Sequence, residues 1–68
     1  MGLVILLRVL DKNMYVTIYD ERNNDVMFEG LAGEAMETLR GWNPTVEYID
    51  ENRSQGFGNR GIYIEVKR

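Results

Sequence analysis

The 68-residue chain contains no cysteine and no histidine. Without cysteine it forms no disulfide and has no thiolate nucleophile. Without histidine it lacks the usual general base near neutral pH and the usual zinc ligand. Ser54 is the only serine, and no residue of the chain is suited to activate its hydroxyl. These absences argue against an enzyme, and we expect no catalytic residues, no bound metal and no cofactor.

The chain also lacks a long hydrophobic run. Its most apolar segment, Leu3–Leu10, is interrupted by Arg8 and ends at Asp11. A membrane span needs about 20 apolar residues, and a signal peptide needs a basic start and small residues at a cleavage site. We therefore expect this segment to belong to the fold, and the protein to be cytoplasmic with no membrane partner.

The composition that is present is typical of a small globular domain. Hydrophobic residues make up 44% of the chain and charged residues 28%, which argues against disorder. A chain of this length forms one domain, residues 1–68, close to the lower limit for folding without a disulfide or metal. The net charge of −3 disfavours non-specific attraction to nucleic acid or to an anionic membrane.

Two interpretations are open for the segment Leu3–Leu10. Its four leucines recur at i, i+3, i+4 and i+7, which places them on one face of a helix. Its three β-branched residues instead favour a buried strand that is apolar on both faces. We favour a short helix.

A hairpin is predicted next. From Met14 to Asp20 apolar residues alternate with tyrosine and threonine, the pattern of a half-buried strand. Glu21–Asn24 predicts a turn, because asparagine tolerates left-handed backbone conformations. Asp25–Glu29 returns as the second strand, with Val26 and Phe28 expected to face the core.

The second half predicts a helix followed by two strands. An apolar stripe at helical spacing indicates the helix, and a glycine is a natural stop after it. Proline has no N–H for a ladder, so the next strand is expected to begin after Pro44. The predicted ranges are Leu31–Arg40 for the helix, with Gly41 as its stop, Thr45–Asp50 and Ile62–Lys67 for the strands, and Glu51–Gly61 for a polar loop.

The predicted order is therefore α-β-β-α-β-β. Both hairpins are expected to be antiparallel from their connections. The expected fold class is α+β, with a small antiparallel sheet of about four strands and one or two short helices on one face.

Three short motifs follow one another along the first half of the chain. They are Leu6–Asp11 (LLRVLD), Val16–Asp20 (VTIYD) and Phe28–Gly30 (FEG). With these motifs, and an isoleucine- and valine-rich final strand, the chain resembles a group of short uncharacterised phage and prophage proteins. It departs from their pattern in its long Asn52–Arg60 loop and in Met14, where threonine is commoner.

This resemblance implies a setting rather than an activity. Small accessory proteins carried by phages often inhibit host machinery, including CRISPR effectors and other defence systems. A host protein is therefore the expected partner, and the host cytoplasm the expected location.

The glycine-rich loop has several interpretations. Gly56–Gly61 spells G-x-G-x-x-G, but a dinucleotide site needs this motif between a strand and a helix, whereas here a strand follows. Its Gly-Phe-Gly also resembles an RNA-recognition strand, but Asn59 and Arg60 break that pattern. We interpret the segment as a hairpin loop, with a partner-binding loop contacting through Arg53, Phe57 and Arg60 as the alternative.

Carboxylates occur in pairs that could act as general acid and base if burial separated their pKa values. We expect these carboxylates to lie in turns and on an exposed helix face, so both members of each pair should be solvated and ionised. The ligand spacing of a calcium loop is absent. The pairs are Asp20 and Glu21, Glu34 and Glu37, and Asp50 and Glu51.

Tyrosine supplies the most informative pattern. Tyr15, Thr17 and Tyr19 share the outward parity of the first strand, and Tyr63 and Met27 are expected beside them. Tyrosine is enriched at protein interfaces because it buries a large area at small entropic cost. A second interpretation is that exposed sheet faces favour tyrosine for its β-propensity alone.

Three functions from different classes follow. We favour a phage-type inhibitor that binds a host protein through the tyrosines and the arginine-bearing loop, either as a monomer or as a homodimer formed through Leu3–Leu10. A structural or assembly homo-oligomer is the first alternative, because the Leu3–Leu10 segment has more apolar positions than one face can bury and such a patch marks an interface. A nucleic-acid-binding module is the second, and the acidic balance counts against it.

Overall fold

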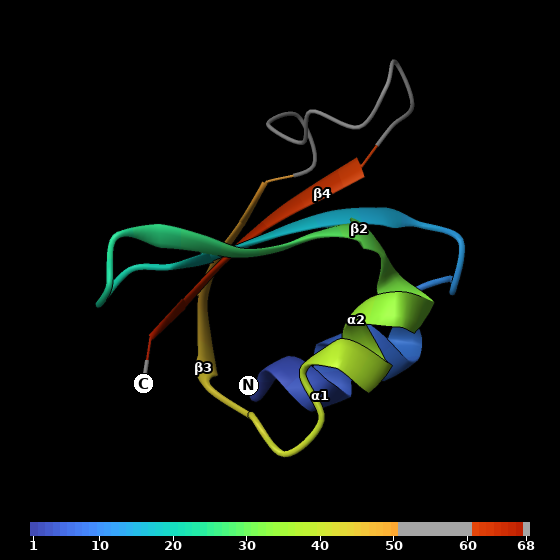
Figure 1. The fold of residues 1–68 in the computed structure, drawn as a ribbon, viewed down its shortest axis with the longest axis horizontal. Coiled ribbons are helices and arrows are strands. Elements are labelled where there is room, and N and C mark those ends of the chain that lie inside the picture. Colours follow the sequence, from blue (N-terminus) through green and yellow to red (C-terminus); the bar gives the residue numbers. More distant parts are fainter. Residues whose placement is uncertain (51–60, 68) are drawn as a thin grey trace.

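Six elements form a four-stranded sheet with two short helices. The computed structural model describes residues 1–50 and 61–67. The α+β class and the predicted order of elements are confirmed (Figure 1). The elements are α1 (Leu3–Val9), β1 (Tyr15–Asp20), β2 (Asp25–Leu31), α2 (Ala32–Thr38), β3 (Thr45–Asp50) and β4 (Gly61–Lys67).

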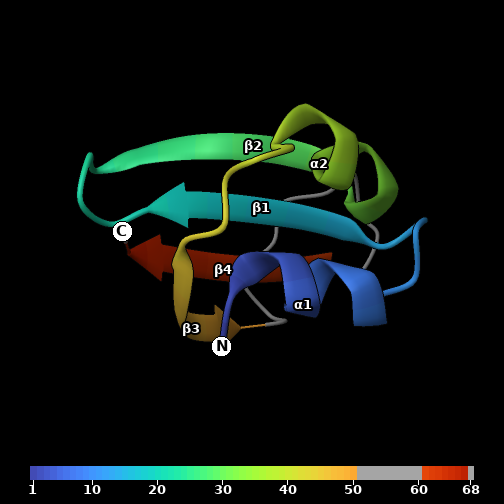
Figure 2. The ribbon, with the colours of Figure 1, turned by 90° about the horizontal axis from the view of Figure 1, so that it is seen from below.

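The sheet has the strand order β2-β1-β4-β3 and is mixed (Figure 2). Both outer pairs, β1 with β2 and β3 with β4, are antiparallel, as the hairpins predict. The central pair, β1 with β4, is parallel. No tight turn joins these two strands, so chain connectivity does not impose their relative direction.

Both helices pack on one face of the sheet, below it in Figure 1, and the core lies between the two layers. The side of the sheet with the alternating valines and isoleucines meets the leucines of α1 and the alanines of α2. The helical interpretation of the first segment is therefore correct. The buried apolar side chains are Leu3, Leu6, Leu7, Val16, Ile18, Ala32, Ala35, Ile64 and Val66.

The first turn of α1 is held by the segment that leads into β3. Leu3 N–H donates to the Pro44 carbonyl at 2.9 Å, and Val4 N–H donates to Asn43 Oδ1 at 2.9 Å. A Cβ on Gly2 would lie 2.7 Å from Asn43 Oδ1, so only glycine leaves room for this contact. A seven-residue helix is marginal by itself in water. These bonds satisfy N–H groups that have no acceptor within the helix.

A bulge in β2 corrects one prediction. The β1–β2 register shifts between Ile18 and Tyr19, so that Ile18 lies opposite Phe28 but Tyr19 lies opposite Val26. Met27 is the extra residue. Since a one-residue shift moves a side chain to the other face of a sheet, Val26 does not point into the core as predicted, and it is 45% exposed.

Asp20 corrects a second prediction, because its side chain is not solvated but 1% exposed. Its Oδ1 accepts from the backbone N–H groups of Arg22 and Asn23, and its Oδ2 accepts from the Asn23 side-chain amide at 2.7 Å. The carboxylate thus organises the turn between β1 and β2. Asn24 completes that turn with a left-handed φ of 55°, as the sequence predicts.

Replacing Asp20 with alanine should lower the free energy of unfolding by about 1–3 kcal/mol, because it leaves buried donors without an acceptor. Asp20→Asn keeps an acceptor oxygen and should lose less. Urea titration followed by circular dichroism measures both variants. Equal stability of Asp20→Ala and the parent chain would show that the carboxylate does not hold the turn.

Replacing Asn43 with alanine should cost about 1 kcal/mol, the usual effect of losing a helix cap. The matched control is Asn13→Ala, which removes an exposed asparagine whose side chain forms no hydrogen bond within the described residues. Amide hydrogen exchange should then show faster exchange at Val4 only in Asn43→Ala. Unchanged protection of that amide would contradict the capping role.

Candidate protein-binding face

The side of the sheet away from the helices carries the predicted tyrosines. Strand pairing settles which residues share it, because residues opposite each other in the register lie on the same face. Thr17 lies opposite Tyr63, and Tyr19 lies opposite Glu65. We call this surface the tyrosine face and define it by its central residues, Tyr15, Thr17, Tyr19, Tyr63 and Glu65.

Two tyrosines from different strands stack at the centre of the tyrosine face. The rings of Tyr19 and Tyr63 have centroids 6.2 Å apart and planes inclined by 30°. Their strands are parallel neighbours, and the two rings meet on a diagonal of the register. The Tyr19 hydroxyl donates to Asn24 Oδ1 in the adjoining turn. The pair is therefore held in place before any partner arrives, which lowers the entropic cost of binding.

Beneath these rings lies a polar residue with little exposure. Thr17 is buried, and its hydroxyl donates to Glu29 Oε2 at 3.4 Å, across to β2. All three tyrosines named so far are half-buried. The sheet face thus already has packed, oriented side chains at its centre.

The tyrosine face extends onto both edge strands. On β2, Val26 lies opposite Tyr19 and takes the place that the sequence had given to Met27. On β3, Tyr48 lies opposite Glu65, and its hydroxyl donates to Asp50 Oδ2 at 3.2 Å. Tyr48 is 46% exposed, whereas Tyr15, Tyr19 and Tyr63 are half-buried.

Sequence reasoning missed Tyr48 because a second bulge hides its parity. Val46 lies opposite the buried Val66, so strict alternation would put Tyr48 on the same, inner face. Glu47 is the extra residue at this bulge, and it moves Tyr48 to the outer face. No glycine or proline within β3 signals the irregularity.

Among residues 1–50 and 61–67, carboxylates outnumber cations on this side of the sheet. Glu29 lies opposite Thr17, Glu65 opposite Tyr19 and Asp50 opposite Tyr63, whereas Lys67, opposite Thr45 on β3, is the matching cation. Aromatic rings beside carboxylates suit arginine and lysine, which stack on rings and pair with carboxylates. The chemistry of the surface therefore fits a basic protein surface.

Several predicted contact residues cannot be assigned to this surface. Arg53, Phe57 and Arg60 lie outside the described residues. Met27 is 39% exposed, but as the bulge residue it has no partner in the register. Tyr15, Tyr19 and Tyr63, by contrast, are brought together on one face as predicted.

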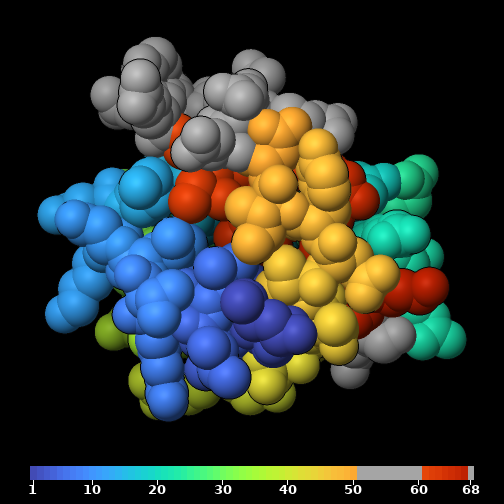
Figure 3. Space-filling view, turned by 180° about the vertical axis from the view of Figure 1, so that it is seen from behind, coloured from blue at the N-terminus to red at the C-terminus, as the bar shows by residue number. Residues whose placement is uncertain are grey.

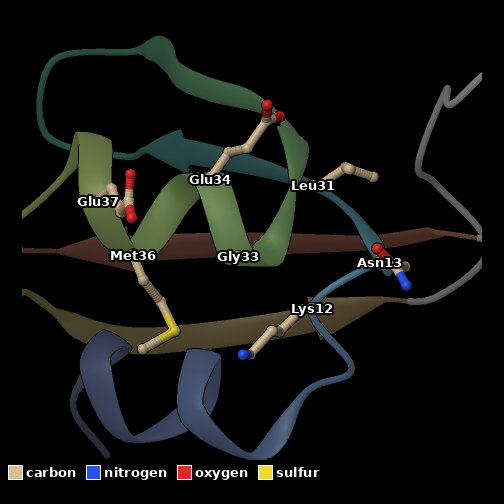
Figure 4. Close-up of a pocket in the computed structure, with 7 residues that line it drawn as sticks. All are labelled: Lys12, Asn13, Leu31, Gly33, Glu34, Met36 and Glu37. Carbon is tan, nitrogen blue, oxygen red and sulfur yellow. The ribbon is translucent and has the colours of Figure 1, made fainter.

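The helix layer has two hollows of mixed chemistry. The first is lined by Lys12, Asn13, Leu31, Gly33, Glu34, Met36 and Glu37, and Figure 4 shows Lys12 and Met36 pointing toward the space between the helices. The second, between α1 and α2, has an apolar floor that includes Leu7 and Ala35, with Arg8 and Arg40 among its lining residues. Neither brings together a nucleophile and a base.

Two further features bear on the kind of site. Among residues 1–50 and 61–67, no group of three acidic side chains is placed to hold a metal ion. In the same ranges, neither helix is long and apolar enough to cross a membrane.

Comparison with known proteins adds no functional assignment. No protein-family model, no curated protein and no solved structure matches this chain.

Proposed function

We propose that this protein acts by binding another protein through its tyrosine face. The observation that carries the proposal is the stacked Tyr19–Tyr63 pair, two aromatic rings on the side of the sheet away from the helices. Tyrosine and arginine dominate the binding energy of protein interfaces, and rigid aromatic anchors lose little entropy on binding.

The charge of the surface narrows the chemistry of the partner. Glu29, Asp50 and Glu65 surround the rings, so a partner with exposed arginine or lysine is complementary to them. The resemblance to phage and prophage proteins suggests that such a partner is a host protein, for example a component of a CRISPR or other defence system. Binding would then inhibit that protein.

The first test is affinity capture from bacterial lysate. A tagged chain is incubated with the lysate, the bound proteins are identified by mass spectrometry, and the complex is sized in solution. A partner that is retained at near-stoichiometric level, and that binds the purified chain directly, is the expected result. Recovery of the chain alone from lysates of several candidate hosts would contradict the proposal.

Substitutions then test the surface. Tyr19→Ala and Tyr63→Ala should each weaken binding about 30-fold, the effect of losing a hot-spot side chain worth about 2 kcal/mol. Tyr19→Phe keeps the ring and should lose less. Met36→Ala is the matched control, because it removes an exposed apolar side chain from the helix layer. Isothermal titration calorimetry measures all four.

The interpretation of these variants depends on folding. Circular dichroism and a thermal melt establish that each variant keeps the parent fold. If folded Tyr19→Ala and Tyr63→Ala bound the partner as tightly as the parent chain, the tyrosine face would not be the binding surface.

A further inference from the structure

Apart from the exposed Arg8, the side chains of helix α1 are all apolar, although only one side of the helix is buried. Leu3, Leu6 and Leu7 face the core, whereas Ile5 is 58% exposed and Val9 is 74% exposed. Residues four apart are neighbours on a helix surface, so Ile5 and Val9 adjoin. A helix that is hydrophobic all round is normally covered on all sides.

A further exposed apolar side chain precedes α1. Met1 is 68% exposed and leads into Gly2, whose backbone is extended rather than helical. We define the outer α1 stripe as Met1, Ile5 and Val9. Figure 3 shows α1 and β3 side by side on this side of the molecule. Ile49 of β3 lies opposite the buried Ile64, on the helix side of the sheet, and is 45% exposed.

We propose that the outer α1 stripe binds a second copy of this chain. In the dimer, α1 of one chain packs antiparallel against α1 of the other about a two-fold axis close to Ile5. Each chain uses the same surface, so the contact closes on itself and adds no third copy.

Charge complementarity argues for a second copy. Arg8 lies three residues beyond Ile5, on the side of Ile5 that is away from Val9 around the helix, so it flanks the stripe. In an antiparallel pair, Arg8 of one chain lies level with residue 2 of the other. Gly2 bridges Thr45 of β3, and Val46 N–H donates to the Met1 carbonyl at 2.8 Å. Glu47 follows Val46 in β3, so it lies close to residues 1 and 2 of its own chain.

The two-fold arrangement therefore brings Arg8 of each chain toward Glu47 of the other. Both side chains are exposed, and neither forms an ion pair with any residue in the described part of the chain. The same surface thus offers an apolar centre, a cation at one end and a carboxylate at the other, which is the pattern that a copy of itself complements.

The size of the surface determines how strong the dimer is. A patch of this kind exposes on the order of a few hundred Å², below the roughly 800 Å² per partner of a standard interface. We therefore expect a reversible dimer with a dissociation constant in the micromolar range or above.

The sheet edges do not compete with this contact. Both edge strands carry a bulge, with Met27 as the extra residue in β2 and Glu47 in β3. Bulges and charges on edge strands protect against pairing with other chains. Association is thus directed to the helix.

This dimer goes beyond the proposed function and does not depend on it. The stripe lies on the helix side of the sheet and the tyrosine face on the other side. Dimerisation leaves both tyrosine faces open, so a dimer presents two binding surfaces to a multimeric partner, with the gain in affinity that bivalency brings.

Sedimentation velocity measures the association of the purified full chain from about 1 µM to about 1 mM, the range that brackets a micromolar constant. We expect a monomer–dimer equilibrium. Ile5→Glu and Val9→Glu should each raise the dissociation constant at least about tenfold, since they put a charge in the apolar centre. Met27→Glu is the matched control and should change nothing, because Met27 is 39% exposed on a different edge.

A charge exchange separates a second copy from any other occupant of the stripe. Arg8→Glu and Glu47→Arg alone should weaken the dimer, because each places like charges together, and the double variant should restore it. A monomer at every concentration would overturn the proposal, as would a dimer that Ile5→Glu leaves intact or a double variant weaker than both singles. Each of these results leaves the measured binding of Tyr19→Ala to a captured partner unaffected, so the two proposals fail separately.

Discussion

The structure depends on covering one face of a four-stranded sheet with two helices of seven residues each. Because the helices are this short, they must lie close to the sheet to cover its apolar side chains. α2 presents Ala32 and Ala35 to the core, which lets its backbone approach the sheet closely, while α1 contributes three buried leucines. The cover is nevertheless incomplete, because Ile49 on the inner side of β3 stays partly exposed. The surplus apolar surface of α1 lies at the margin of this thin layer.

Most of the fold could be predicted from the sequence, because its signals are local. Alternation in β1 and β4, the turn at Asn24 and the leucine spacing of α1 each specify an element within a few residues. The helix α2 ends at Thr38 rather than at the predicted Arg40, and Gly41 follows with a φ of 84°. Tyr15, Tyr19 and Tyr63 of the candidate site were found by the same alternation, whereas Tyr48 was missed.

The features that could not be predicted depend on contacts between distant segments. No signal in the sequence predicts the bulges in β2 and β3. Each bulge nevertheless changes which side chains share a face, and Val26 and Tyr48 point outward as a result. Asp20 is buried because the end of β4 lies beside its turn, where Glu21 N–H donates to the Val66 carbonyl at 3.0 Å. The parallel pairing of β1 with β4 is likewise a tertiary choice. The periodicity of a single strand does not predict the bulges, the burial of Asp20 or the parallel pairing of β1 with β4.

The central place of β4 has a consequence for synthesis. It is the last of the six elements to leave the ribosome, yet it lies between β1 and β3 and contributes Ile64 and Val66 to the core. The N-terminal leucines and the inner edge of β1 therefore have no partner strand while translation continues. The nascent chain can form the β1–β2 hairpin early, but cooperative folding of these six elements requires β4. A chain truncated within β4 should therefore fail to fold. It should be bound by chaperones or degraded by proteases rather than form a smaller domain.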